Sequence, residues 1–176
     1  MLNIGIIGAG RIGKVHLESI SYHVKGAVVT AIAEGIAGTL ALEKPASINV
    51  TTPVQRRETP SFGEGDIVVF GVPVYIGRVP NLIRDYFASI KGNGAIGIPV
   101  VVYGNRAYED TLSELQDVLT DCGFECVAAV AAIAEHSIIR EFGAGRPDAD
   151  DCAQLTAFAE KIRERLENPT DMPLIV

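Results

Sequence analysis

Short, continuous apolar runs alternate along this chain with longer stretches in which apolar residues recur every three to four positions. The short runs are bounded by Gly and Pro and are typical of strands buried on both faces, whereas the longer stretches are typical of amphipathic helices. The predicted strands are residues 3–7, 48–52, 67–72, 98–103 and 124–133, and the predicted helices follow Gly13 and span 81–90, 109–121 and 149–166. Strands that alternate with helices predict an α/β fold, a doubly wound parallel sheet of five or six strands between two helical layers.

Residues 28–33 fit two predictions. Val28 or Val29, with Ile32, Ile36 and Leu40, recur at helical spacing and would form one face of an amphipathic helix. Residues 28–33 are also apolar enough to form a second strand. We favour the strand, because otherwise roughly 40 residues would separate the first strand from the next, which is long for a connection with one helix.

Composition narrows the range of partners. The 176 residues suffice for one domain, and 15 basic against 22 acidic residues give a net charge of −7, which disfavours nucleic acid and anionic membrane surfaces. No apolar run reaches the length of a membrane span and no leader is recognisable, so we expect a cytoplasmic protein. An acidic surface would suit a basic redox protein partner. Three cysteines without a wider ligand set predict reduced thiols and no metal site.

Residues 8–13 read GAGRIG, a G-x-G-x-x-G between a predicted strand and a predicted helix. In this motif Gly8 allows the tight turn, Gly10 lets the backbone approach a phosphate, and Gly13 lets helix and strand pack closely. Arg11, Lys14 and the helix N-terminus would attract an anion. The segment therefore predicts a site for a nucleotide cofactor or an anion.

The first 34 residues resemble the NAD-binding start of the inositol dehydrogenase and glucose–fructose oxidoreductase family. By this resemblance Glu34 stands where the family has its ribose-binding acidic residue. The pyrophosphate of NAD(P) would be bound by Gly8, Gly10, Arg11, Ile12 and Gly13. Members of the family carry a second, catalytic domain for which this chain has no room, so the resemblance implies NAD(P) binding without turnover.

Two predicted strands end in loops that each carry a tyrosine. Ligands of parallel sheets bind at such carboxyl ends, so the loops could hold a flat aromatic ligand between them; ordinary strand-to-helix turns are the alternative. The candidate residues are Pro73, Val74, Tyr75 and Gly77 in one loop and Tyr103, Gly104, Asn105 and Tyr108 in the other. His136 stands between Glu135 and Ser137, and because adjacent residues cannot converge as a triad we predict a structural or ligand-rim role and no catalytic residue.

A second, larger resemblance covers residues 31–176. It rests on the segments FGEGDIVVFGVPVYIGRVP, VVVYGNRAYEDTLSELQDVLTDCGFECVAAVAAIAEHSI and GAGRPDADD, which resemble flavodoxin-like domains that precede a two-cluster ferredoxin module. It implies one flavodoxin-like domain over residues 1–176, with a Rossmann-like piece at 1–34, a body at 35–166 and a tail at 167–176. It also implies FMN-type electron transfer, with Tyr75 or Tyr108 stacked on the flavin ring.

The two resemblances conflict, and we interpret the chain as a hybrid, engineered from a Rossmann amino terminus and a flavodoxin-like body; a divergent natural protein is the alternative. The flavodoxin-like relatives wrap the FMN phosphate in a Ser/Thr-rich loop, but no hydroxyl lies between Gly8 and Lys14. Each missing hydrogen bond to a charged group forfeits roughly 1.5–3 kcal/mol. We therefore expect weak or absent FMN binding and no independent catalytic activity, with NAD(P) binding as the alternative.

Overall fold

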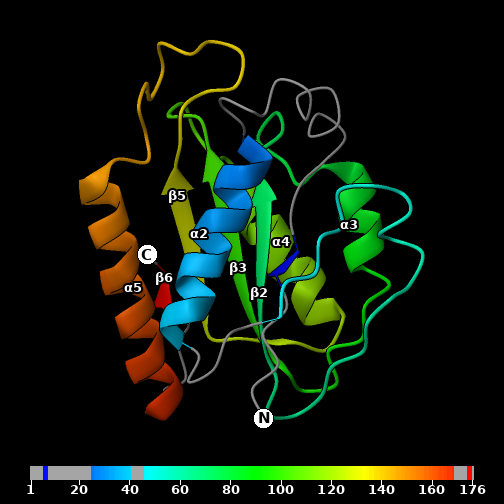
Figure 1. Ribbon diagram of the computed structural model, residues 1–176. Coiled ribbons are helices and arrows are strands. Elements are labelled where there is room, and N and C mark those ends of the chain that lie inside the picture. Colours follow the sequence, from blue (N-terminus) through cyan, green and yellow to red (C-terminus); the bar gives the residue numbers. More distant parts are fainter. Residues whose placement is uncertain (1–5, 8–24, 41–45, 169–173, 176) are drawn as a thin grey trace.

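The computed structural model describes residues 6–7, 25–40, 46–168 and 174–175, whose helices and strands form three layers (Figure 1). The elements in chain order are β1 (Ile6–Ile7), α2 (Lys25–Leu40), β2 (Ile67–Pro73), α3 (Asn81–Phe87), β3 (Ile96–Tyr103), α4 (Thr111–Asp121), β4 (Glu125–Cys126), β5 (Ala128–Ile133), α5 (Ala149–Glu167) and β6 (Leu174–Ile175). Within these residues the strands pair in parallel in the order β1-β2-β3-β5-β6, with β4 also beside β3. The predicted doubly wound α/β fold is confirmed.

In the part of the chain that the structure describes, the sheet is buried between two pairs of helices. In β2, Ile67 and Val69 pack in the core beneath α2 and α5, whereas Val68, Phe70 and Val72 pack in the core beneath α3 and α4. Figure 1 shows α2 and α5 side by side over one face of the sheet. The continuous apolar run of β2 follows from this arrangement, because alternate side chains of a strand must fill two apolar cores.

Gly71 lets α2 lie close to β2. A Cβ at Gly71 would stand 3.0 Å from Val29 Cγ1 and 3.3 Å from the Cβ of Ala33, both buried residues of α2. A larger side chain would therefore push the helix off the sheet, in a core packed to the density of a crystal.

The strand predicted for residues 28–33 is wrong, because these residues lie within α2. Val29, Ile32, Ile36 and Leu40 are buried on one side of that helix and join the core shared with α5. The helical spacing of these apolar residues was the correct signal. Their burial against the sheet outweighs the helix-weakening effect of Gly35 and Gly38, in line with the general weakness of intrinsic propensity.

The strand predicted for residues 48–52 is also absent. Asn49 Oδ1 accepts hydrogen bonds from Thr51 N at 2.9 Å and Thr51 Oγ1 at 2.6 Å. Arg56 Nη1 donates to the carbonyls of Val50 at 2.6 Å and Thr51 at 2.9 Å. These side chains bind backbone groups that a sheet would have used, and local bonds of this kind compete with strand pairing.

Other boundaries differ by a few residues. The run 124–133 is divided at Val127 into β4 and β5, and α3 ends at Phe87 rather than at residue 90. The predicted tail contributes β6, which pairs with β5 through Ala128 and Leu174. The predicted helix after Gly13 lies outside the described residues. Among the helices that the structure describes, none combines the length and apolar character needed to cross a bilayer.

Candidate functional site

The loops that follow β2, β3 and β5 gather at one edge of the sheet, because the three strands are parallel (Figure 1). They comprise residues 74–80, 104–110 and 134–148. The amino-terminal end of α2 also lies at this edge. In doubly wound sheets such a carboxyl edge is the usual place for a ligand.

The loop after β2 forms a tight turn with an apolar tip. Tyr75 N donates to the carbonyl of Arg78, and Arg78 N donates to the carbonyl of Tyr75, both at 3.0 Å. Between them Ile76 has φ 52° and Gly77 has φ 72°, the two positive angles of a type I′ turn. A β-branched residue is strained at such an angle, yet Ile76 is 94% exposed. Backbone strain at an exposed apolar tip indicates a functional position.

The loop after β3 presents a second tyrosine. The rings of Tyr103 and Tyr108 meet edge to face with centroids 5.4 Å apart. Tyr108 is 36% exposed and Tyr75 38%, so both residues are partly accessible to solvent. Burial raises the pKa of Tyr75 above its ordinary value. Asn105 at φ 59° adopts a left-handed conformation that Asn tolerates better than most residues.

The loops pack so closely at two glycines that a residue with a side chain would not fit at either position. A Cβ at Gly77 would stand 2.0 Å from Glu109 Oε2, and one at Gly104 would stand 2.7 Å from His136 Cδ2. Real Cβ atoms do not approach other atoms this closely, so each glycine permits one loop to contact the next. The two tyrosine-bearing loops and the loop after β5 therefore form one connected edge.

Glu135 and His136 shape the loop after β5. Glu135 accepts from Arg140 Nε at 2.8 Å and from Gly145 N at 3.2 Å. His136 Nδ1 accepts from the backbone N–H groups of Ile138 at 3.2 Å and Ile139 at 3.1 Å. An Nδ1 that accepts hydrogen bonds carries no proton, so this geometry belongs to the neutral imidazole. The geometry gives His136 a structural role, one of the two roles predicted for it.

Asp151 closes the same loop onto α5. Its carboxylate accepts hydrogen bonds from Arg146 and from Asp148 N, and Asp148 in turn accepts from Asp151 N in a capping box. The hydrogen bond from Arg146 is the main cause that lowers the pKa of Asp151 from 3.8 to about 2. The Asp151 side chain is 7% exposed and the Arg146 side chain 34%, so solvent reaches the pair from the arginine side and partly screens it.

Asp151 should therefore make unfolding depend on pH in a defined window. A carboxyl group whose pKa is lower in the folded state stabilises fully above its unfolded pKa, and this stabilisation is lost as pH falls from about 4 to about 2. The shift corresponds to at most about 2 kcal/mol, and solvent screening at the partly exposed Arg146 reduces this figure. We expect Asp151→Asn to remove that part of the acid sensitivity in urea unfolding at pH 6, 4 and 2.5. Asp150→Asn, at an exposed neighbouring position, is the matched control; an unchanged pH slope in Asp151→Asn would contradict the assignment.

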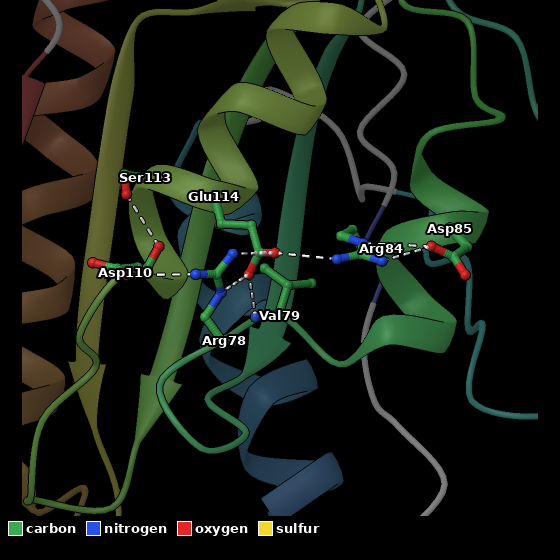
Figure 2. A network of polar contacts seen from close by, with 7 residues as sticks. All are labelled: Arg78, Val79, Arg84, Asp85, Asp110, Ser113 and Glu114. Atoms are coloured by element: carbon green, nitrogen blue, oxygen red, sulfur yellow. Dashed lines mark hydrogen bonds and ion pairs between the residues drawn. The ribbon is translucent and has the colours of Figure 1, made fainter.

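Glu114 on α4 attaches the first of these loops to α4 and lies near α3 (Figure 2). Its carboxylate accepts from Arg78 Nε and Nη2, both at 3.1 Å, and from Val79 N at 2.8 Å. Arg84 Nη1 of α3 lies 3.5 Å away, and Asp110 lies 3.5 Å from Arg78. Burial acts to raise the pKa of Glu114, but the bonds from Arg78 and Val79 outweigh it and leave the pKa below its ordinary value.

The structure brings together the eight candidate residues of the two tyrosine-bearing loops, Pro73, Val74, Tyr75, Gly77, Tyr103, Gly104, Asn105 and Tyr108. Glu34 lies instead on an exposed part of α2, so the strand end that its predicted ribose-binding role requires is absent. The other candidates for NAD(P), Gly8, Gly10, Arg11, Ile12 and Gly13, lie outside the described residues. Ile76 and Glu114 were not predicted. A type I′ turn with Gly at its second position could have marked Ile76, but nothing in the sequence marks Glu114.

No known family pattern and no curated protein matches the sequence. Among solved structures, a flavodoxin of Streptococcus pneumonia TIGR4 matches with a TM-score of 0.55 at 15% identity, covering 94% of this chain and 99% of its own. An azoreductase from Bacillus anthracis str. Sterne has a TM-score of 0.47 at 11% identity, over 97% of this chain and all of its own (100%). At these identities the similarity concerns architecture alone, and the first of the two carries the conclusion. The chain has a flavodoxin-like α/β fold.

Proposed function

We propose that this protein binds a flavin weakly, with the isoalloxazine ring held at the carboxyl edge of the sheet between the loops of Tyr75 and Tyr108, for FMN-type electron transfer. The observation that carries the proposal is the pair of half-exposed tyrosines on two loops that contact each other at Gly77 and Glu109. A flat aromatic group fits such an edge, because stacked and edge-to-face aromatic pairs stabilise by about 0.5–1.5 kcal/mol each beyond area burial. Bound FMN would supply the redox chemistry itself.

Three of the four arginines in these loops support weak binding of the phosphate, because each is paired with a carboxylate: Arg78 with Glu114, Arg140 with Glu135, and Arg146 with Asp151. The fourth, Arg106, is exposed in the loop after β3. An arginine already paired with a carboxylate gains less from a phosphate than a solvated one, because the existing pair must first be broken. The segment that follows β1 carries GAGRIG in place of a hydroxyl-rich loop. The presence of GAGRIG where the flavodoxin-like relatives have a Ser/Thr-rich loop is also part of the basis for our interpretation of the chain as a hybrid.

A fluorescence titration with riboflavin and with FMN tests the proposal. We expect the purified protein to be colourless, and both flavins to be quenched with dissociation constants within about tenfold of each other, since the ring rather than the phosphate is bound. Replacing both rings, in Tyr75→Ala with Tyr108→Ala, should remove about 1–3 kcal/mol of binding, a roughly 5- to 150-fold loss of affinity. Leu82→Ala, at an exposed apolar position of α3, is the matched control and should bind as the unmodified protein does.

Two results would contradict the proposal in different ways. Stoichiometric FMN retained through purification would mean that the phosphate is bound well. Riboflavin fluorescence that stays unquenched at high protein concentration would mean that no ring site exists. NADH and NADPH belong in the same titration, because binding of these nucleotides alone would favour the dinucleotide alternative.

A further inference from the structure

The Tyr75–Arg78 turn is attached to the body of the fold by a carboxylate on another element. Glu114 is an α4 residue whose side chain is 11% exposed, and it accepts hydrogen bonds from the Arg78 guanidinium and from the backbone of Val79. Figure 2 shows Arg78 and Arg84 approaching this carboxylate from opposite sides. The Glu114 carboxylate thus holds both Arg78, which closes the turn, and Val79, which follows it. Its contact with Arg84 also relates the turn to α3.

The contact between Arg78 and Glu114 has the geometry of a two-pronged pair. Arg78 Nε bonds to Glu114 Oε2 and Arg78 Nη2 to Glu114 Oε1, each at 3.1 Å. Two parallel bonds fix both the position and the plane of the guanidinium, which a single ammonium cannot do. The turn therefore has a defined orientation relative to α4. The second tyrosine-bearing loop leads directly into the amino end of this helix.

Surface exposure argues that this pair contributes to geometry more than to global stability. The Arg78 side chain is 57% exposed, and Asp110, its other partner, is 75% exposed. Pairs that solvent reaches in this way stabilise folding little. The turn itself holds a strained Ile76 at φ 52°, and a strained conformation persists only where its surroundings enforce it. Glu114, whose side chain is 11% exposed, bonds to the turn from another element.

We propose that Arg78 and Glu114 are positioning residues that hold the Tyr75–Arg78 turn in the conformation that accepts the flavin ring. The inference rests on the proposed function and adds a requirement to it: Tyr75 must be presented at a fixed angle to the second loop. When a competent conformation is only partly populated, the apparent affinity falls by that fraction. We call the Arg78–Glu114 pair the clamp. Loss of the clamp should therefore weaken binding of the flavin ring without removing any group that touches the ring.

Two conservative variants test the clamp. Arg78→Lys keeps the charge but not the two-pronged geometry, and Glu114→Gln keeps an acceptor for Val79 N but not the ion pair. We expect each variant to bind riboflavin about two- to fivefold more weakly, the range that a partly exposed ion pair can supply. We also expect the backbone amides of residues 75–78 to lose order in ¹⁵N relaxation measurements on the ligand-free protein. Glu160→Gln removes a carboxylate from the exposed Arg163–Glu160 pair on α5 and should change neither reading.

The outcomes separate the two proposals. Folded variants that keep both their riboflavin affinity and the order of the turn would overturn the clamp. A lowered unfolding midpoint with unchanged affinity would assign the pair a merely structural role and overturn it as well. If the unmodified protein fails to bind riboflavin, the proposed function falls, and the positioning role of this pair falls with it. The relaxation data would then still show whether these residues hold the turn.

Discussion

Replacing residues 8–13 with a Ser/Thr-rich loop should raise the affinity for FMN by about 10²–10⁴-fold. The present GAGRIG offers no hydroxyl to a terminal phosphate dianion. Regaining two hydrogen bonds to a charged group would contribute roughly 3–6 kcal/mol. The affinity for riboflavin should not change, because riboflavin has no phosphate. Isothermal titration calorimetry with both flavins measures the two affinities in the same variant.

A loop of the same length composed of Gly and Ala serves as the control for this replacement. It should leave both affinities as they are in the unmodified protein. Equal gains for riboflavin and FMN in the Ser/Thr-rich variant would show that the loop acts on the ring or on the fold. Our proposal that the missing hydroxyl groups weaken FMN binding would then be wrong.

Phe70→Ala should lower the free energy of unfolding by about 3–5 kcal/mol, the range for removal of a buried aromatic ring. Phe70 is fully buried on β2, and its ring meets those of Phe87 and Phe124 edge to face at 5.2 and 5.0 Å. The loss includes both the transfer of the ring and the cavity left between α3, α4 and the sheet. Urea unfolding followed by far-UV circular dichroism measures it.

Phe142→Ala is the matched comparison, because that ring lies on the loop after β5 and is largely exposed. Its effect should stay within about 0.5 kcal/mol. If Phe70→Ala does not fold, Phe70→Leu should still unfold at a lower urea concentration than the unmodified protein. Similar losses at positions 70 and 142 would contradict the assignment of Phe70 to the core.

The strands of the sheet centre could be predicted because their pattern has one explanation. An apolar run such as residues 67–72, bounded by a glycine-rich loop and Pro73, suits a strand with a core on each face, and both cores are present. The two tyrosine-bearing loops followed from the same reasoning, since parallel strands end at one edge. Their actual contact at Gly77 and Glu109 depends on backbone angles that no pattern of polarity specifies.

The failures have identifiable physical causes, most of them contacts with distant parts of the chain. The apolar pattern of residues 28–33 is compatible with both a strand and a helix. Burial of Ile32 and Ile36 against the sheet, which is a tertiary effect, favours the helix. Residues 48–52 have strand propensity, but Arg56 binds the carbonyls of Val50 and Thr51. Glu114 could not be identified at all, because its importance depends on a partner 36 residues away in sequence.

The most direct test of the proposed flavin site is an NMR titration of the ¹⁵N-labelled protein with riboflavin. A competing location exists in the apolar groove between α2 and α5, lined in part by Ile36 and Leu155. Binding at the carboxyl edge predicts that the largest shift changes fall on the amides of residues 75–78 and 104–109. Changes confined to the groove, or none at saturating riboflavin, would contradict the site.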